Sequence, residues 1–568
     1  MRPHPEDPLR PRAAIGRGPR CTPRPGLPPI AQWLLGLSLA LGSEPAWARP
    51  TPEGEPTARL SGALAEAWRH RASAALEERL PRFAEGARVV VESDEELDAD
   101  ALAAMGAEEE SRTGGLWQLW LPVDHLPQLA ALPGVRHVRE PAYAEVKTVE
   151  SEGHTATGAS VWAEAGWTGV GVDVAIVDVG FVDYEALVGS ELPAELSTDF
   201  ERGAAGSTAH GTAVAEVIAD VAPGARFHLV TFGTDVELVA ALENLADTDV
   251  DVVNASIGFD NVWAGDGSSA PSQAVQALVD EGMIVTVAAG NEALKYRVGA
   301  LNAVGDGRIL LAGAVAARIP APRGRARVSL RWEEPFAGAR TDLDLLVINA
   351  DTGTECGRSE APQDGDDPPR EAVDTSGCSD SVLAIVTAEP GVDPAGLRGW
   401  LYSPNGIEAD GRTLAASLSI PGDAPGALTV GAWLADAGEV APWSSRGPTD
   451  DGRIKPDVVA PSDVSTTVWG DRAFSGSSAA TPHAAGLAAL WVQSHGTPDG
   501  FADWAREGAT DGGAPGADPV WGWGALNAGP VPEGCACGSA GGGSGWAWWP
   551  VALAAAARRR RCYPLAAR

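Results

Sequence analysis

A serine stands where a helix is predicted to begin, in the segment FSGSSAATPHAAGL of residues 474–487. Small residues give way there to a helical pattern of apolar positions, so Ser478 is expected at or beside a helix N-terminus. Free N–H groups and the positive end of the helix dipole favour an anion at such a place, which suits a serine that attacks a carbonyl group. The alternative is an ordinary buried helix start that Ser477 and Ser478 cap.

A serine hydroxyl is a weak nucleophile, so this chemistry requires a base and a group that orients the base. Asp178 ends the apolar run of GVDVAIVDVGF, which predicts a buried parallel strand with a carboxylate at its C-terminal edge. His210 opens an amphipathic helical pattern in AHGTAVAEVIADV. Asn291 ends another buried-strand pattern, GMIVTVAAGN, and its side-chain amide can donate to an oxyanion.

These four segments, in the order Asp, His, Asn, Ser, resemble the conserved boxes of the subtilisin-like serine proteases (subtilases). AIVDVGF resembles the Asp box, AHGTAVA the His box, VTVAAGN the Asn box and SGSSAATPHAAG the Ser box. PGDAPGALTVGAW and APWSSRGPTDDGRIKPDVVAP are similar to the subtilase segments that precede the nucleophile. The resemblance implies a serine endopeptidase that hydrolyses peptide bonds through an acyl-enzyme.

The resemblance also implies a role for each site residue. Ser478 would be the nucleophile, His210 the general base and then the general acid, and Asp178 the carboxylate that orients His210. Asn291 would donate to the oxyanion together with the Ser478 backbone N–H. The implied substrates are proteins or peptides.

Ser256 and Gly258 of the segment ASIG match the strand that binds the substrate backbone in this family. Ala288, Ala289 and Gly290 indicate a roomy, apolar site for the substrate side chain next to the cut bond. No cofactor is required for this chemistry, and no catalytic metal is predicted.

Composition limits the classes of partner. The chain has 568 residues, enough for several domains, with 44% apolar and 21% charged residues as in ordinary globular proteins. Its net charge of −35 argues against a nucleic-acid partner and indicates either a soluble extracellular or salt-tolerant surface or a genome of biased composition. Nothing in the sequence indicates an oligomer, so a monomer is expected.

Two segments precede the Asp box. Residues 1–48 have the character of a signal peptide, with the apolar run IAQWLLGLSLALG and an Ala-x-Ala site at 46–48, so export is expected. Residues 49–150 alternate strand and helix patterns as a small α/β domain does. Their position resembles that of a subtilase propeptide, which implies a zymogen with an intramolecular inhibitor. A stable accessory domain that stays attached is the alternative.

The catalytic fold is expected in two parts, 151–305 and 419–530, as a doubly wound α/β domain with a mainly parallel sheet. The stretch between Asn291 and Ser478 is too long for a bare subtilase core. Residues 306–418 are therefore predicted to form an inserted antiparallel β-sandwich, because strand-like runs alternate there with turns rich in Gly, Pro and Asp.

The insert holds two further candidate sites. Cys356 and Cys378 are expected to form a disulfide in an exported protein. The insert is similar to small β-domains of secreted bacterial peptidases. Its acidic pair Asp342 and Asp344 leaves two interpretations open, a structural calcium site and a solvated strand edge.

The last segment, 531–568, joins GCACGSAGGGSG, an apolar run and RRRR. It resembles the tripartite C-terminal sorting tags of bacteria, most closely the MYXO-CTERM type, with Cys535 and Cys537 at the processing site. Transient attachment to the membrane or cell envelope, followed by a location at the cell surface or release, is implied. The apolar run is short for a permanent span.

Two residues depart from the subtilase pattern. Val179 follows Asp178 where Ser or Thr is usual, and Ala213 replaces the second His of the His box. With the large insert, Val179 keeps open a second hypothesis, a surface-binding protein in which catalysis is vestigial. A third hypothesis, a peptidase of acidic pH with a Ser-Glu-Asp site, is disfavoured because His210 and Asn291 stand where that family has acids.

Overall fold

The computed structural model describes residues 59–71, 83, 86–142, 154–200 and 203–532. The predicted signal peptide and nearly all of the predicted sorting tag lie outside the described residues. Within the described part of the chain, no helix combines the length and the apolar character that crossing a membrane requires.

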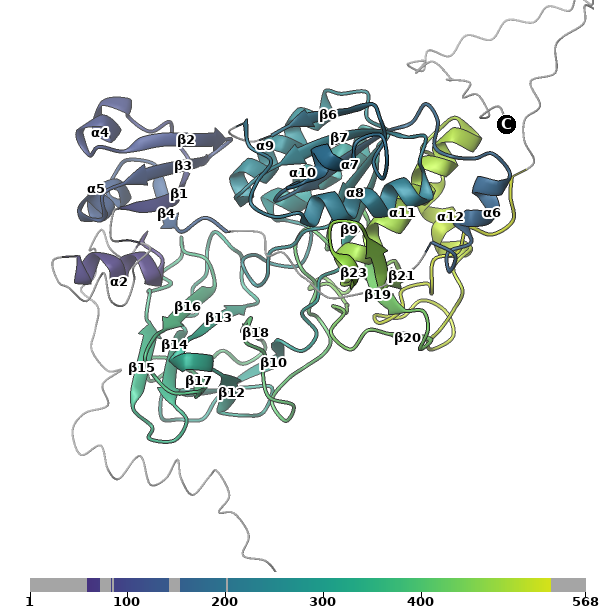
Figure 1. The fold of residues 1–568 in the computed structure, drawn as a ribbon. Helices are drawn as coiled ribbons and strands as arrows, with labels where there is room; N and C mark the ends of the chain where they lie inside the picture. Colours follow the sequence, from purple (N-terminus) through teal and green to yellow (C-terminus); the bar gives the residue numbers. More distant parts are fainter. Residues whose placement is uncertain (1–58, 72–82, 84–85, 143–153, 201–202, 533–568) are drawn as a thin grey trace, which may run out of the picture. The chain divides into compact units, whose positions relative to one another are not determined.

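An eight-stranded sheet connects the segments that carry the predicted site residues (Figure 1). Its strands, in spatial order, are β20 (Glu439–Val440), β19 (Leu428–Leu434), β9 (Ile284–Ala288), β8 (Val252–Ala255), β5 (Asp173–Asp178), β7 (Arg226–Thr231) and β6 (Leu196–Asp199), and β21 (Val458–Ser462) also pairs with β19. Every pairing except that of β19 with β20 is parallel. The predicted mainly parallel α/β sheet is therefore confirmed.

Helices cover both faces of this sheet: α8 (His210–Val221), α9 (Asp235–Ala246), α10 (Ala270–Asp280) and α11 (Ser477–His495). Successive residues of a strand point to opposite faces. In β5, Val174 and Ile176 belong to the apolar core that includes α8 and α11, whereas Ala175 and Val177 belong to the core that includes α9 and α10. A strand buried on both faces explains the continuous apolar run before Asp178.

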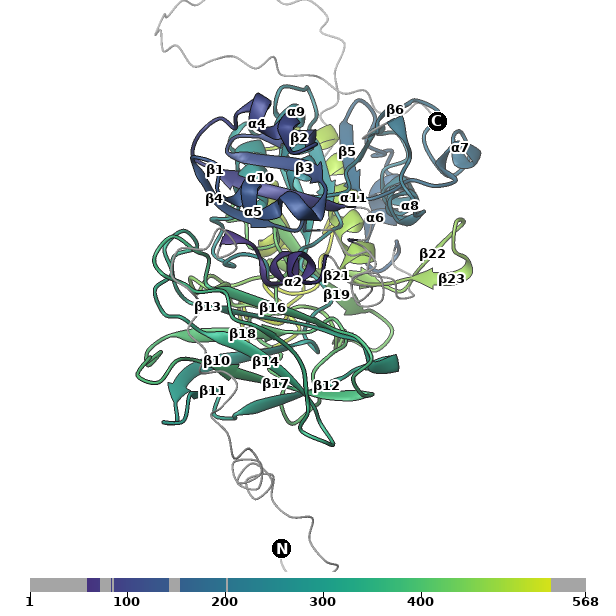
Figure 2. The same cartoon turned by 90° about the vertical axis from the view of Figure 1, so that its left-hand side faces the viewer.

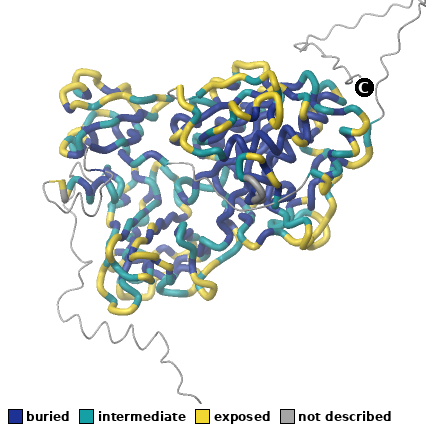
Figure 3. The backbone as a smooth tube through the Cα atoms, in the orientation of Figure 1, coloured by how far each residue is buried: buried dark blue, intermediate teal, exposed yellow. Residues whose placement is uncertain are grey.

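Helix α11 is part of the core rather than a surface helix. Its residues from Ser477 to Gln493 are all buried (Figure 3). It packs against α8 and against the strands β8, β9, β19 and β21. Pro482 lies in its second turn, where the helix continues without an interruption.

The N-terminal region forms a four-stranded antiparallel sheet in the order β2-β3-β1-β4 (Figure 2). Its elements are α2 (Gly62–His70), β1 (Ala87–Ser93), α4 (Ala99–Ala104), β2 (Glu108–Thr113), β3 (Leu116–Leu121), η3 (Val123–His125), α5 (Leu126–Ala130) and β4 (Val135–Arg139). Strand β2 is an addition to the predicted strand–helix–strand–helix–strand order. Its sequence EEESRT is polar and has no fully buried residue, so no apolar alternation marks it.

The region between the two halves of the parallel sheet forms a nine-stranded antiparallel sheet in the order β15-β14-β17-β11-β10-β18-β13-β16, with β12 beside β17. Its strands are β10 (Tyr296–Ala303), β11 (Arg308–Leu311), β12 (Ala316–Pro320), β13 (Ala326–Trp332), β14 (Asp344–Asn349), β15 (Glu355–Ser359), β16 (Arg370–Thr375), β17 (Ser381–Thr387) and β18 (Arg398–Tyr402). Strand β10 pairs with β18 along its first part and with β11 along its last part. The sheet thus curves toward a barrel around one apolar core.

This antiparallel region starts at Tyr296, ahead of the predicted boundary at 306. A disulfide joins Cys356 of β15 to Cys378, which confirms the predicted pair. Burial raises the pKa of Asp344 to about 8, with Asp342 among the carboxylates that add to the shift. Asp342 accepts a hydrogen bond from the Gln363 backbone N–H. A calcium ion at this pair stays a hypothesis beside that of a solvated strand edge.

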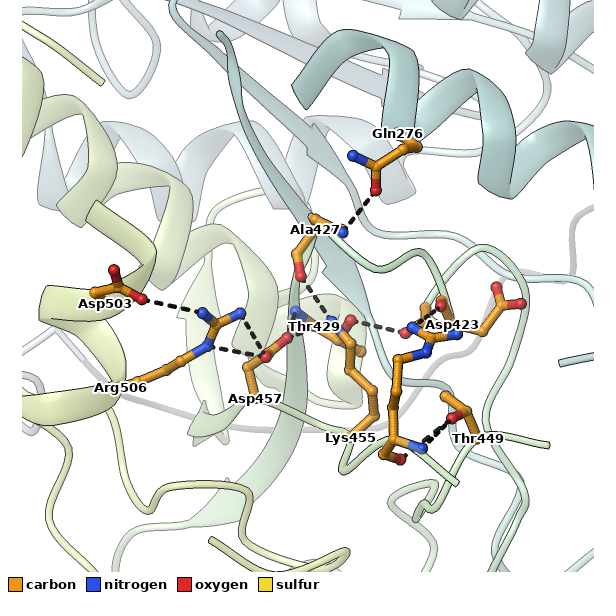
Figure 4. Close-up of polar contacts among 12 residues, drawn as sticks. Gln276, Asp423, Ala427, Thr429, Thr449, Lys455, Asp457, Asp503 and Arg506 are labelled. Atoms are coloured by element: carbon orange, nitrogen blue, oxygen red, sulfur yellow. Dashed lines mark hydrogen bonds and ion pairs between the residues drawn. The ribbon is translucent and has the colours of Figure 1, made fainter. Parts of the chain in front are cut away.

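A buried ionic network ties β19, β21 and α12 (Phe501–Glu507) together (Figure 4). Asp457 Oδ2 accepts from Lys455 Nζ at 2.6 Å and from the Thr429 N–H at 2.7 Å. Asp457 Oδ1 accepts from Arg506, with Nη2 at 2.9 Å. Lys455 and Asp457 are 3% and 5% exposed, and burial lowers the pKa of Lys455. The carboxylate therefore binds the buried Lys455 and the partly exposed Arg506.

Replacing Asp457 with alanine is expected to destabilise the protein by about 3–5 kcal/mol, because Lys455 then stays buried without its counter-ion. Denaturant unfolding, followed by tryptophan fluorescence in a Ser478→Ala background that excludes self-digestion, measures the loss. Asp503→Ala is the matched control, since Asp503 contacts the same Arg506 from a side chain that is 80% exposed. Equal stability of the two variants would contradict this account of the network.

Candidate active site

Asp178 and His210 form a buried hydrogen-bonded pair. Asp178 ends β5 with no exposed surface, and its Oδ2 lies 2.8 Å from His210 Nδ1. Because an ionised carboxylate only accepts hydrogen bonds, Nδ1 carries the proton and Nε2 of the neutral ring is the basic nitrogen. The other carboxylate oxygen accepts from the Val179 backbone N–H at 2.8 Å. This backbone donor engages Asp178 although Val179 lacks a hydroxyl.

His210 is the first residue of α8, and its position is fixed by the turn before it. The Gly211 N–H donates to the Gly180 carbonyl at 2.8 Å, which joins the helix start to the chain just after β5. Nε2 of His210 is buried and has no hydrogen-bond partner among the described residues. Its ring meets the ring of Phe474 edge to face, with centroids 5.4 Å apart. The ring is thus held in place, while no hydrogen bond among the described residues occupies Nε2.

Ser478 is the second residue of α11, and its side chain is 3% exposed. Its hydroxyl donates to the Ser256 carbonyl at 3.0 Å, and the Ser256 hydroxyl donates to the Ser478 carbonyl at 3.1 Å. These reciprocal bonds join the start of α11 to the segment that follows β8. Within the described residues, no hydrogen bond joins Ser478 to His210. Hydrogen bonds of this kind are often loose before a substrate binds.

Asn291 is oriented by Ser477. Its Oδ1 accepts from the Ser477 backbone N–H at 2.9 Å and from the Ser477 hydroxyl at 3.1 Å. The Ser477 hydroxyl in turn accepts from the Gly290 N–H at 3.0 Å. These contacts fix the amide plane, and Nδ2 stays buried without a partner among the residues that the structure describes. Ser477 is a positioning residue that the sequence offered only as a helix cap.

The hairpin β22 (Val464–Thr466) and β23 (Gly470–Phe474) leads into the helix that carries Ser478. Glu216 of α8, 3% exposed, accepts from the backbone N–H groups of Thr467 and Val468 at the hairpin turn. Burial raises the pKa of Glu216. The Phe474 ring at the end of the hairpin meets the His210 ring. Both the turn and the end of the hairpin therefore contact α8. The helical pattern of 210–221 gave no sign of this role for Glu216.

Known proteins match this fold. The sequence model of the subtilase family matches residues 169–314 and 365–524, together more than half of the chain. The CspB protease of Clostridium perfringens is similar in structure, with a TM-score of 0.50 and 18% identity over 66% of this chain and 97% of that chain.

Fervidolysin from Fervidobacterium pennivorans, a keratinolytic enzyme related to subtilisin, is a weaker match, with a TM-score of 0.43 and 16% identity over 79% of this chain and 62% of that chain. The structural likeness to CspB concerns the fold alone. The family match covers the segments of Asp178, His210, Asn291 and Ser478. The chain belongs to the subtilase family of serine peptidases.

Proposed function

We propose that the protein is an exported serine endopeptidase, made as a zymogen, with Ser478, His210 and Asp178 as its catalytic triad. The observation that carries this function is the buried Asp178–His210 hydrogen bond, which leaves Nε2 of the ring without a partner among the described residues. A base in this state can accept the proton of an attacking serine.

The reaction follows from these positions. Ser478 Oγ attacks the scissile carbonyl carbon while its proton passes to His210 Nε2, and Asp178 stabilises the imidazolium that forms. Asn291 Nδ2 and the Ser478 backbone N–H donate to the oxyanion. His210 then gives the proton to the leaving amine, and a water molecule hydrolyses the acyl-enzyme by the same route in reverse.

The substrate backbone is proposed to lie as an added strand along Ser256–Gly258. This segment continues from β8, and the Ser256 carbonyl already accepts the hydroxyl of the nucleophile. A substrate strand there would place its carbonyl group beside Ser478. Ser477 joins Asn291 to the start of α11, so the amide proposed to donate to the oxyanion is joined to the same helix start as Ser478.

The zymogen part of the proposal is supported by polar contacts between the N-terminal sheet and α9. Gln118 of β3 has no exposed surface, donates to Glu237 at 3.1 Å and accepts from the Thr234 hydroxyl at 2.6 Å. Arg139 of β4 forms an ion pair with Asp235 at 2.5 Å, and both side chains are buried. An inhibitory domain needs such a specific contact with the domain that it blocks.

Intact-mass analysis of the exported protein, wild type beside Ser478→Ala, tests the function when a fluorophosphonate probe is added to both. Wild type should bind one probe and lose the segment before about residue 150, whereas the variant should do neither. Labelling of the variant, or no labelling of wild type, would contradict the proposed peptidase function. Labelling without loss of the segment would leave a peptidase with an attached accessory domain.

The same mass spectra test the two ends of the chain. Loss of residues 1–48 and of the segment beyond Cys535 is expected if both are processed as export and sorting signals. A mature protein that retains either end would contradict the corresponding part of the proposal.

A further inference from the structure

Strand β18 of the nine-stranded antiparallel sheet carries a buried tyrosine that contacts two carboxylates outside that sheet. The Tyr402 hydroxyl lies 2.8 Å from Glu292 Oε2 and 3.1 Å from Asp260 Oδ2. Tyr402 is 4% exposed, and Glu292 has no exposed surface. A hydroxyl has one proton, so Tyr402 shares this proton between two acceptors in a three-centre hydrogen bond. One side chain of the antiparallel sheet thus joins two segments that follow strands of the parallel sheet.

Both of these segments border the proposed reacting atoms. Glu292 directly follows Asn291, whose amide is proposed to donate to the oxyanion. Asp260 comes two residues after the segment Ser256–Gly258, which is proposed to bind the substrate backbone. The two segments continue from the neighbouring parallel strands β9 and β8. The distance between the segments therefore sets the distance between a bound peptide and the oxyanion donor.

The antiparallel sheet also anchors the chain beside Asp260. Asn261 is 3% exposed, and its side-chain amide donates to the Ser329 carbonyl and hydroxyl, at 3.2 and 3.0 Å, and to the Trp400 carbonyl at 3.2 Å. Ser329 belongs to β13 and Trp400 to β18. The φ of 56° at Asn261 lies in the left-handed region, which asparagine tolerates. Asp260 is thus one residue away from a point that is fixed on the strand of Tyr402.

The contact with Tyr402 is the buried one of two contacts that an oxygen of the Glu292 carboxylate makes with a side chain near it. Lys295 Nζ lies 3.2 Å from Glu292 Oε1, and its side chain is 27% exposed, so this ion pair is partly screened by water. The Tyr402 ring packs on the ring of Tyr296 in β10, with centroids 4.9 Å apart, which fixes the direction of the hydroxyl. Without that hydroxyl, the carboxylates of Glu292 and Asp260 would lose their shared donor, and their like charges would push the two segments apart.

We propose that Tyr402 is a positioning residue of the peptidase, which fixes the distance between the substrate strand and Asn291. This inference rests on the proposed peptidase function. Ser477 orients the amide plane of Asn291, and Tyr402 holds the backbone that carries this amide in its place. The placement matters because an oxyanion donor acts at a position that the oxygen reaches only in the transition state. The antiparallel sheet thereby takes part in catalysis through the site residues that it holds.

The variant Tyr402→Phe tests the proposal, because it removes the hydroxyl and retains the ring against Tyr296. We expect it to lower kcat for peptide hydrolysis at least about tenfold and to leave KM within about twofold of wild type, since a contact made only in the transition state acts on kcat. Complete loss of one oxyanion donor costs about 10²–10³ in subtilisin, which sets the upper limit of the effect. Steady-state kinetics with one peptide substrate measures both constants.

A double-mutant cycle with Asn291→Ala separates positioning from a general structural role. If Tyr402 acts through the Asn291 amide, Tyr402→Phe should lower kcat by no more than about twofold once that amide is absent. A second cycle with Glu292→Ala should give the same result, because Tyr402 reaches Asn291 through Glu292. A loss of equal size in every background would show that Tyr402 only stabilises the fold.

Lys295→Ala is the matched control, since Lys295 contacts the same Glu292 carboxylate from a partly exposed side chain. Its kcat should stay within about threefold of wild type, as is typical of an exposed ion pair. The near-ultraviolet circular dichroism spectrum and the denaturant midpoint of each variant serve as the controls for folding. A loss of kcat in Lys295→Ala as large as that in Tyr402→Phe would contradict the special role of the tyrosine.

Two further outcomes would overturn the inference. Tyr402→Phe could have the kcat of wild type, which would show that its hydroxyl does not position Asn291. It could also have a raised KM and an unchanged kcat, in which case the hydroxyl would act on ground-state binding alone. If wild type hydrolyses no peptide and binds no fluorophosphonate probe, it is the proposed function itself that fails.

Discussion

Replacing Ser478 or His210 with alanine is expected to lower kcat for peptide hydrolysis by about 10⁶, and the double variant should lose no more than either single variant. The magnitude is that measured for subtilisin and does not derive from this chain. In the proposed mechanism the two residues act as one unit, because the hydroxyl needs the base and the base has no other function in the reaction. Once one is removed, the other contributes nothing.

Steady-state kinetics with one peptide substrate, the same for all variants, measures these losses. The near-ultraviolet circular dichroism spectrum of each variant serves as the control for folding. The Ser478→Ala change removes only the hydroxyl bond to the Ser256 carbonyl, so the fold should persist. Losses that add up in the double variant would show that Ser478 and His210 do not share one step.

Replacing Asp178 with asparagine is expected to lower kcat by about 10⁴, as the equivalent change does in other enzymes with this triad. The Val179 N–H occupies Oδ1, so the amide oxygen of an asparagine would take that position. Its NH2 group would then face His210 Nδ1 and donate to it. The ring would carry its proton on Nε2 and could no longer accept the proton of Ser478.

The matched control is Asp183→Asn, five residues further along the chain at an exposed position. It removes the same charge, and asparagine tolerates the positive φ of 68° found there. Its kcat should equal that of wild type. A kcat for Asp178→Asn close to that of Asp183→Asn would show that Asp178 does not determine the tautomer of His210.

The sequence located the proposed site residues that stand at the ends of regular elements. Asp178 ends a strand, His210 and Ser478 begin helices, and each apolar pattern marks its own boundary. The structure brings Asp178 and His210 into contact as the order of the four segments led us to expect.

Other site residues could not be predicted, because their partners come from distant parts of the chain. Glu216 looks like a polar position in a helical pattern until residues 467 and 468 donate to it. Ser477 looks like a helix cap until its hydroxyl is seen to contact Gly290 and Asn291 from a distant part of the chain. Spacing and residue type indicate local periodicity. They do not indicate which segments meet when more than a hundred residues separate them in the sequence.

The burial of α11 bears on how such an enzyme is controlled. The helix that presents Ser478 is also a central member of the folding core, with every residue from 477 to 493 buried. Packed interiors do not deform gradually, so the nucleophile cannot be shifted out of line without unfolding the domain around it. Any regulation of the proposed peptidase is therefore expected to act on access to Ser478 rather than on its position. For the proposed zymogen, latency is therefore expected to come from occlusion of a site that is already assembled.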